Sequence, residues 1–359
     1  MAAWKALWQR APAPLLGIDI SSTTIKLVEL GRAASGQYVL ERCAIEPLER
    51  GWVTEGNIDK FDEVAEALRQ VVRKSGSKTR QVALALPGSA VITKKILLPM
   101  GLSERELEFQ VEAEAGQYIP FPLDEVSLDF CVGGPSAHSA DLVEVLLAAS
   151  RKEKVADRQG LAEAAGLKPV IMDVESYASR MAAMRLVAHL PNQGRDLLIA
   201  LLEIGSQTTS LQVVRNGEVI YERDQMFGGA QLTHQIARHY NLPFEEADQR
   251  KKNADLPEDY ARVVLPPFLE GLAQEVGRAL QFFFTSTPHN KVEHILLSGG
   301  SAALPGLAAM VQLQTQFQCQ IVQPFEGMLL GPAVKGAPLQ RDATSYLVAT
   351  GLAMRRFVS

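Results

Sequence analysis

The first part of the chain alternates between apolar strands and short polar turns. From Leu15 an apolar run ends in Asp19, a Ser/Thr-rich turn follows, and the chain returns as a second strand. Another strand-like run covers residues 37–45, so the pattern predicts a β-meander. Apolar residues then recur at the helical period over residues 61–74, and Gly76 follows as a stop signal, which predicts a helix.

Residues 81–165 have a pattern of their own. The predicted elements are, in order, strands at 82–86 and 91–98, a helix opened by the capping box Ser103-Glu-Arg-Glu106, strands at 126–132 and 142–149, and a helix over 152–165. This ββαββα order is an α+β pattern that differs from the flanking segments. It predicts a small subdomain inserted into the first domain.

A strand over 169–174 and a helix over 176–190 lead to the loop Pro191-Asn-Gln-Gly194, which marks a domain boundary near residue 192. Beyond it, Asn216-Gly217 predicts a tight hairpin turn between two strands. Helices are expected near residues 231–240, 244–252 and 262–285. The predicted division is a tail (1–14), a first domain (15–80 and 166–191), an inserted subdomain (81–165) and a second domain (192–359).

Two segments in separate halves of the chain share one pattern. The first is LLGIDISSTTIKLVEL and the second is ALLEIGSQTTSLQVV, in which Asp19 corresponds to Glu203. Each has an apolar strand, an acid, a polar turn and a return strand. Such a turn directs N–H and hydroxyl donors at one point, which suits phosphate oxygens, while the acid suits Mg²⁺ or its bound waters. One such turn alone is more often a structural hairpin, but two facing turns would hold a polyphosphate from both sides.

A third segment, HILLSGGSAALPGLAAMV, reads as a buried strand, a Gly-Gly turn and a helix. This arrangement lets a nucleotide approach backbone N–H groups closely. The segment lacks the G-x-G-x-x-G spacing of a dinucleotide fingerprint.

Composition narrows the class of protein. The length of 359 residues predicts about two domains, and 47% hydrophobic with 21% charged residues is ordinary for a soluble protein. The net charge of -5 and the lack of a long basic block argue against nucleic acid as a partner. The three cysteines lie far apart, and neither an HExxH nor a G-x-S-x-G motif occurs, which argues against zinc and a serine nucleophile. No apolar run reaches the length of a membrane span and no signal-peptide pattern occurs, so we expect a cytoplasmic location.

The N-terminal segment carries Trp4 and Trp8 beside Lys5 and Arg10. Two interpretations stay open: a short amphipathic helix that docks on a membrane surface or a partner, and a frayed tail that ends at the following prolines.

The doubled acid–turn–strand followed by strand–Gly-Gly–helix resembles the layout of the actin, Hsp70 and hexokinase superfamily. Lys26 lies seven residues after Asp19, where actin-like proteins carry a phosphate-binding lysine. The segments QYIPFPLDEVSLDF, IMDVESYA, MFGGAQLTHQIA and GLAMR narrow the resemblance to the type IV pilus assembly family PilM, relatives of the division protein FtsA. The resemblance covers nearly the whole chain from Leu15. It implies an α/β, actin-like (FtsA-like) two-domain ATPase fold with an inserted subdomain called 1C, beside the main subdomain 1A.

The resemblance also implies an ATP/ADP site between the domains. The matching residues are Asp19, Ser21, Ser22, Thr23 and Lys26 in the first phosphate loop, Glu203, Gly205, Ser206 and Thr208 in the second, and Gly299, Gly300 and Ser301 in the adenosine loop. Asp19 and Glu203 would hold Mg²⁺, mainly through water.

Three further residues have two interpretations each. Asp248 and Lys251 match the acid and lysine that flank the nucleoside in FtsA-like proteins, but they also fit a solvated helical charge pair. Glu175 matches the acid that orients the attacking water and would act as a general base, but it also fits an acid favoured by a helix N-terminus.

The resemblance implies a scaffold that is held at the inner membrane by the N-terminal cytoplasmic peptide of PilN, in a groove between subdomains 1A and 1C. Through PilN it would connect PilO and PilP with the motor ATPases. Tyr118, Ile119, Phe121 and Pro122 either contact this peptide or form subdomain core. The chain has Ser21 where relatives often have Gly and Glu203 where most have Asp, so we expect binding with slow or no hydrolysis. The alternatives are an FtsA-like filament-forming division ATPase and a small-molecule kinase of the same superfamily.

Overall fold

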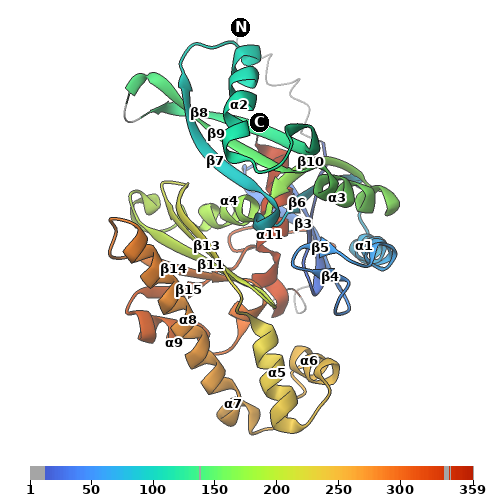
Figure 1. The fold of residues 1–359 in the computed structure, drawn as a ribbon. Helices are drawn as coiled ribbons and strands as arrows, with labels where there is room; N and C mark the ends of the chain where they lie inside the picture. The colour runs from blue at the N-terminus through green and yellow to red at the C-terminus, as the bar shows by residue number, and fades with distance from the viewer. Residues whose placement is uncertain (1–12, 137–138, 335–338, 340, 359) are drawn as a thin grey trace.

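The computed structural model describes residues 13–136, 139–334, 339 and 341–358, and the N-terminal tryptophans lie outside these ranges. Two sheets organise the chain (Figure 1). The first contains, in spatial order, β10 (Lys168–Val174), β6 (Gln81–Leu86), β1 (Leu16–Ile20), β2 (Thr24–Arg32), β3 (Tyr38–Pro47) and β16 (Leu329–Leu330). The second contains β13 (Glu218–Gln225), β12 (Thr209–Arg215), β11 (Ile199–Ile204), β14 (His294–Ser298) and β15 (Gln318–Ile321).

The two sheets repeat one topology. In each, a three-stranded antiparallel meander (β1–β3 or β11–β13) is extended from its first strand by parallel strands (β6 and β10, or β14 and β15). The carboxyl ends of β1 and β11 therefore occupy equivalent positions. The sequence echo is thus a structural duplication.

Helices cover both faces of the first sheet. On one face, α1 (Phe61–Ser75) and α3 (Lys152–Ala164) bury a core that includes Leu68, Leu84 and Leu161. Gly76 ends α1 in the left-handed conformation, as the sequence predicts. On the other face lie α4 (Glu175–Val187) and α11 (Leu347–Met354), which pack against each other.

The inserted subdomain is smaller than the sequence pattern suggests. It is a three-stranded sheet of β7 (Ile92–Pro99), β9 (Ser139–Arg151) and β8 (Val126–Ser136), with α2 (Glu104–Tyr118) on one face. The predicted capping box at Ser103 is present. However, β6 pairs with β1 and β10, and α3 packs against α1, so both belong to the main domain. The expected ββαββα subdomain over 81–165 is therefore corrected to βαββ, because periodicity does not show which sheet a strand joins.

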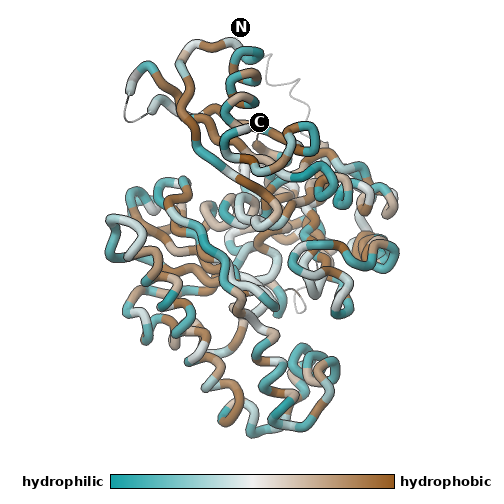
Figure 2. Tube along the Cα trace, viewed as in Figure 1, coloured by the Kyte–Doolittle hydropathy of each residue, from teal (hydrophilic) through white to brown (hydrophobic). Residues whose placement is uncertain are grey.

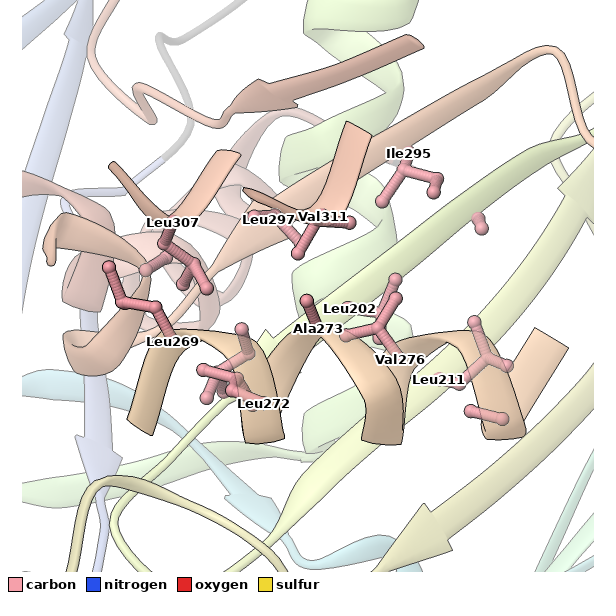
Figure 3. Close-up of a cluster of buried hydrophobic side chains, with 14 of the residues drawn as sticks. Leu202, Leu211, Leu269, Leu272, Ala273, Val276, Ile295, Leu297, Leu307 and Val311 are labelled. Atoms are coloured by element: carbon pink, nitrogen blue, oxygen red, sulfur yellow. The ribbon is translucent and has the colours of Figure 1, made fainter. Parts of the chain in front are cut away.

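The second domain has its core between its sheet and two helices, α8 (Leu265–Ser286) and α9 (Leu307–Thr315) (Figure 3). Leu202, Leu272 and Leu297 are fully buried there. The hydropathy colouring follows this arrangement, with apolar segments along the inner strands and polar segments along outer loops (Figure 2). The helix expected over 262–285 is divided into α7 (Tyr260–Val263) and α8, which begins with Pro in its first turn.

The last part of the chain returns to the first domain. β16 pairs with β3, and α11 contacts β1, β2 and α4. The predicted second domain over 192–359 is thus corrected at its C-terminal side. Residues from both sheets and from α4 and α11 form one shared core, which includes Leu40, Ala182 and Leu201.

The remaining elements are short. They are β4 (Val53–Thr54) and β5 (Asn57–Ile58), which form a small hairpin, α5 (Gly229–Tyr240), α6 (Phe244–Asn253), and the 3-10 turns 88–90, 123–125, 191–194, 300–303, 343–346 and 355–357. Within the described ranges, no helix is both long and apolar enough to cross a membrane.

Candidate nucleotide-binding site

The two predicted phosphate turns have the same backbone geometry. The N–H of Ser21 donates to the carbonyl of Thr24 at 3.0 Å, and the N–H of Gly205 donates to the carbonyl of Thr208 at 2.9 Å. The intervening N–H groups of residues 22–23 and 206–207 donate to no residue that the structure describes. Each turn thus presents free donors immediately after a strand that ends in an acid, which is an arrangement suited to an anion.

In the first turn the acid is paired with a lysine. Asp19 lies opposite Lys26 across β1 and β2, and the Lys26 Nζ is 2.7 Å from Asp19 Oδ2 and 3.2 Å from Ser21 Oγ. Both side chains are buried. In the second turn the residue opposite Glu203 is Ser210, so Glu203 has no lysine on its own hairpin. The two turns therefore differ in charge although they have the same backbone geometry.

Three carboxylates converge between the two sheets. Glu175 begins α4, and the charges of Asp19, Arg158, Glu203 and Lys26 all act on it. Burial, followed by repulsion from Asp19, raises the pKa of Glu175 to about 8. The same two causes raise the pKa of Glu203 to about 7. The site thus brings three carboxyl groups together with two cations, and a bound cation would favour the ionised forms of the carboxyl groups.

The acids do not form a complete metal cage. Among the described residues, no group of three His, Cys, Asp or Glu side chains is placed to hold a metal ion. Mg²⁺ usually keeps several waters and binds through one or two carboxylates together with phosphate oxygens. Asp19 and Glu203 fit that role, and their contact with Mg²⁺ stays a prediction.

The Gly-Gly turn after β14 is fixed to the second phosphate turn. Gly299 has φ +87°, and a Cβ there would lie 2.5 Å from the carbonyl oxygen of Ile204. The Ser301 hydroxyl donates to the Gly205 carbonyl at 3.2 Å. Only glycine permits this approach at residue 299, while Gly300 has open space around it. The structure therefore brings residues 299–301 and 205–208 together.

The N-terminus of α5 also meets this turn. The N–H of Gly229 donates to the Gly205 carbonyl at 3.0 Å, and that of Ala230 donates to the Ser206 carbonyl at 2.8 Å. A Cβ on Gly228 would lie 2.6 Å from the Ser206 carbonyl oxygen. Two separate segments, residues 228–230 and 299–301, thus support the second turn.

Asp248 and Lys251 lie on α6 beside this segment. The Lys251 Nζ is 3.1 Å from Asp248 Oδ1, 2.5 Å from Thr233 Oγ1 and 3.3 Å from the Gly229 carbonyl. Burial lowers the pKa of Lys251. The pair is therefore a partly buried link between α6 and α5, and not a freely solvated charge pair. Its contact with a nucleoside stays a prediction.

The four predicted peptide-contact residues differ in how far their side chains are buried. Ile119 is 6% exposed in a small core with Ala115, Val126 and Ala149, which agrees with the second of its two interpretations, subdomain core. Phe121 packs against that core and lies under the Arg151 guanidinium at 4.0 Å. The exposed members of the set are Tyr118 and Pro122.

Sequence reasoning missed Arg158. Its side chain is 3% exposed within α3, and its charge acts on Glu175 and Asp19. The available signal was its spacing, because Arg158 shares the apolar helix face with Leu161 and Ala162, where a charged residue is unusual.

Comparison with known proteins agrees with this architecture. The family model described as type IV pilus assembly protein PilM matches residues 17–357. A solved PilM-PilN type IV pilus biogenesis complex contains a chain that is 30% identical, with a TM-score of 0.80 over 96% of this chain and 99% of that one. MreB5 of Spiroplasma citri bound to ADP shares the fold, at 14% identity and a TM-score of 0.51 over 98% of this chain and all of that one.

Among curated proteins, the ethanolamine utilization protein EutJ of Salmonella typhimurium is 27% identical over 146 residues, which is 40% of this chain and 48% of that protein. The chain thus aligns with about half the length of this relative. The α/β, actin-like fold expected from the sequence is confirmed by the structural neighbours. Because the family model spans almost all of the described residues, the chain belongs to the type IV pilus assembly protein PilM family.

Proposed function

We propose that this chain is an ATP-binding scaffold of the type IV pilus inner-membrane complex. The observation that carries the nucleotide part is the pair of equivalent turns, each with free N–H donors after an acid-ended strand. ATP or ADP would lie between them, with the phosphates on residues 21–23 and 205–208 and the nucleoside near residues 299–301, Asp248 and Lys251. Mg²⁺ would neutralise the excess of carboxylates.

Slow or absent hydrolysis is part of the proposal. In the first turn Ser21 is bound to both Thr24 and Lys26, so its side chain occupies space that Gly would leave free. In the second turn Glu203 is one methylene longer than Asp and would reach further toward a bound metal ion. Glu175 would serve as the general base, but burial and then the neighbouring Asp19 disfavour its ionised form. These features affect turnover more than binding.

The partner part of the proposal rests on family membership and on the similarity to the PilM-PilN complex. The chain would bind the N-terminal cytoplasmic peptide of a PilN-type membrane protein, and would thereby lie at the cytoplasmic face of the inner membrane. PilO and PilP would be reached through PilN, and the motor ATPases would be contacted from the cytoplasmic side. Tyr118 and Pro122 supply exposed apolar surface on the inserted subdomain for such a contact.

The test measures two affinities separately. Nucleotide binding is followed with a fluorescent ATP analogue and Mg²⁺, and peptide binding is followed by the anisotropy of a labelled PilN-type N-terminal peptide. Lys26→Met removes a cation beside the phosphates, and a charge-assisted contact of about 1.5–3 kcal/mol predicts roughly 10- to 100-fold weaker ATP binding. Lys78→Met, at an exposed position, is the matched control. Failure of the wild type to bind ATP at millimolar concentration, or to bind the peptide, would refute the corresponding part.

A further inference from the structure

Arg158 is a buried cation near the phosphate site. It lies at the middle of α3, which packs against β6 and β10. Its charge acts on Glu175 most strongly and then on Asp19. Lys26 is already paired with Asp19 at 2.7 Å, and Arg158 is the other cation whose charge acts on Glu175.

One side of the Arg158 guanidinium is fixed and the other is not. Nη2 donates to the carbonyl of Gly56 at 3.0 Å, whereas Nη1 is buried and has no hydrogen-bond partner among the described residues. A buried donor without a partner is costly and uncommon. Arg158 also lines a cavity of about 10 Å³ together with Gly56, Pro87 and Asp157. The side chain therefore has both an unused donor and a little room to move.

The hydrogen bond from Arg158 Nη2 to Gly56 connects Arg158 with the base of the inserted subdomain. Gly56 is the turn of the β4–β5 hairpin, with φ +79°, and a Cβ there would lie 2.4 Å from Pro87 Cγ. Pro87 begins the connection into β7, and the return strand is held to the same connection by the Ser150 hydroxyl, which donates to the Ala90 carbonyl at 2.8 Å. The hairpin is thus wedged between α3 and the point where the subdomain leaves the main domain.

We propose that Arg158 is a positioning residue that couples occupancy of the phosphate site to the β4–β5 hairpin and the base of the inserted subdomain. A Mg²⁺–polyphosphate placed among Asp19, Glu175 and Glu203 changes the charge that Arg158 faces. The guanidinium responds through its free Nη1, and its bond to Gly56 transfers the shift to the hairpin and Pro87. A ligand moves an equilibrium only through such differential contacts. This inference rests on the proposed nucleotide binding.

The test is hydrogen–deuterium exchange of residues 53–60 and 87–91 in the full chain, with and without MgADP or a non-hydrolysable MgATP analogue. In the wild type, nucleotide should change exchange in both segments by about threefold or more, as expected for a shift in local opening. Arg158→Gln should abolish this change while the protein still binds nucleotide. Arg158→Lys keeps the charge but not the fork of donors, so it should reduce the change by at least about half even if Arg158→Gln fails to fold.

Lys154→Met is the matched control. Lys154 also holds the hairpin, because its Nζ donates to Asn57 Oδ1 at 2.9 Å. However, Lys154 is not among the charges that act on Glu175 or Glu203. This variant should exchange faster in both states and keep the nucleotide-dependent ratio. A full nucleotide response in both Arg158 variants, or no response in a wild type that binds nucleotide, would overturn the coupling alone. A wild type that binds no nucleotide would overturn the proposed function and, with it, this inference.

Discussion

The crossing of α4 and α11 gives the sharpest test of how the two domains are joined. Gly351 on α11 lies against Ala178 on α4, and a Cβ at residue 351 would be 1.8 Å from the Ala178 carbonyl oxygen and 2.4 Å from its carbonyl carbon. On its other side α11 is equally close to β1, because a Cβ on Gly17 would be 2.1 Å from the Ala349 carbonyl oxygen. Backbone lies on both sides, so α11 has no free direction in which to move.

We therefore expect Gly351→Ala to destabilise the protein although alanine favours a helix. The helix propensity gain is about 1 kcal/mol, and overpacking typically costs about 1–3 kcal/mol. Here the contact atoms are backbone and the helices would have to separate by roughly 1.5 Å to reach ordinary van der Waals distance, so the upper end of that range or more applies. The expected net loss in the free energy of unfolding is about 2 kcal/mol. Because Glu175 begins α4 only three residues before Ala178, ATP binding should weaken as well.

The control is the same substitution at a helical glycine with open space. Gly277 lies within α8, and no atom is within 4 Å of a Cβ placed there. Gly277→Ala should raise stability by up to about 1 kcal/mol, from propensity alone. Urea unfolding is followed by far-UV circular dichroism, which reports both domains, and by the fluorescence of Trp52, which packs against the core of the first domain. A Gly351→Ala midpoint equal to or above that of the wild type would refute the reasoning about the crossing.

Three other predictions concern the site. Lys26→Met leaves the buried Asp19 carboxylate without its partner and should lower the free energy of unfolding by about 3–5 kcal/mol, part of which Asp19→Asn in the same chain restores. Thermal unfolding of the single and double variants checks this, and strictly additive losses would contradict it. Gly299→Ala should weaken ATP binding at least about tenfold, because φ +87° and the Ile204 carbonyl exclude a side chain. Gly277→Ala, in open space on α8, is its control, and equal effects of the two substitutions in an ATP titration would argue against the prediction. Glu203→Asp should raise ATP turnover and leave peptide affinity unchanged, measured by phosphate release and anisotropy; an unchanged rate would show that Glu203 does not limit hydrolysis.

The sequence was sufficient wherever the signal is local. Asn216-Gly217 adopts φ +51° and +82° and joins β12 to β13, as the turn chemistry predicts. Ser103 caps α2, and the helical period of α1 matches its buried face. The repeated acid–turn–strand located both phosphate turns, because the residues that form each turn are neighbours in the chain. The resemblance to actin-like proteins identified Lys26, and the structure shows that it faces Asp19 across one hairpin.

Only the tertiary structure decided which elements share a sheet or a core. The pattern of β6 is the same whether it joins β7 or β1, and only pairing with β1 and β10 assigns it to the main domain. The sequence leaves Ile119 open between peptide contact and subdomain core, and the structure places it in one core with Ala115, Val126 and Ala149. Arg158 reads as one helical charge among many until burial places it between Glu175 and Gly56. Periodicity and turn chemistry act over a few residues, whereas burial, charge coupling and close backbone approach depend on segments that meet only after the chain has folded.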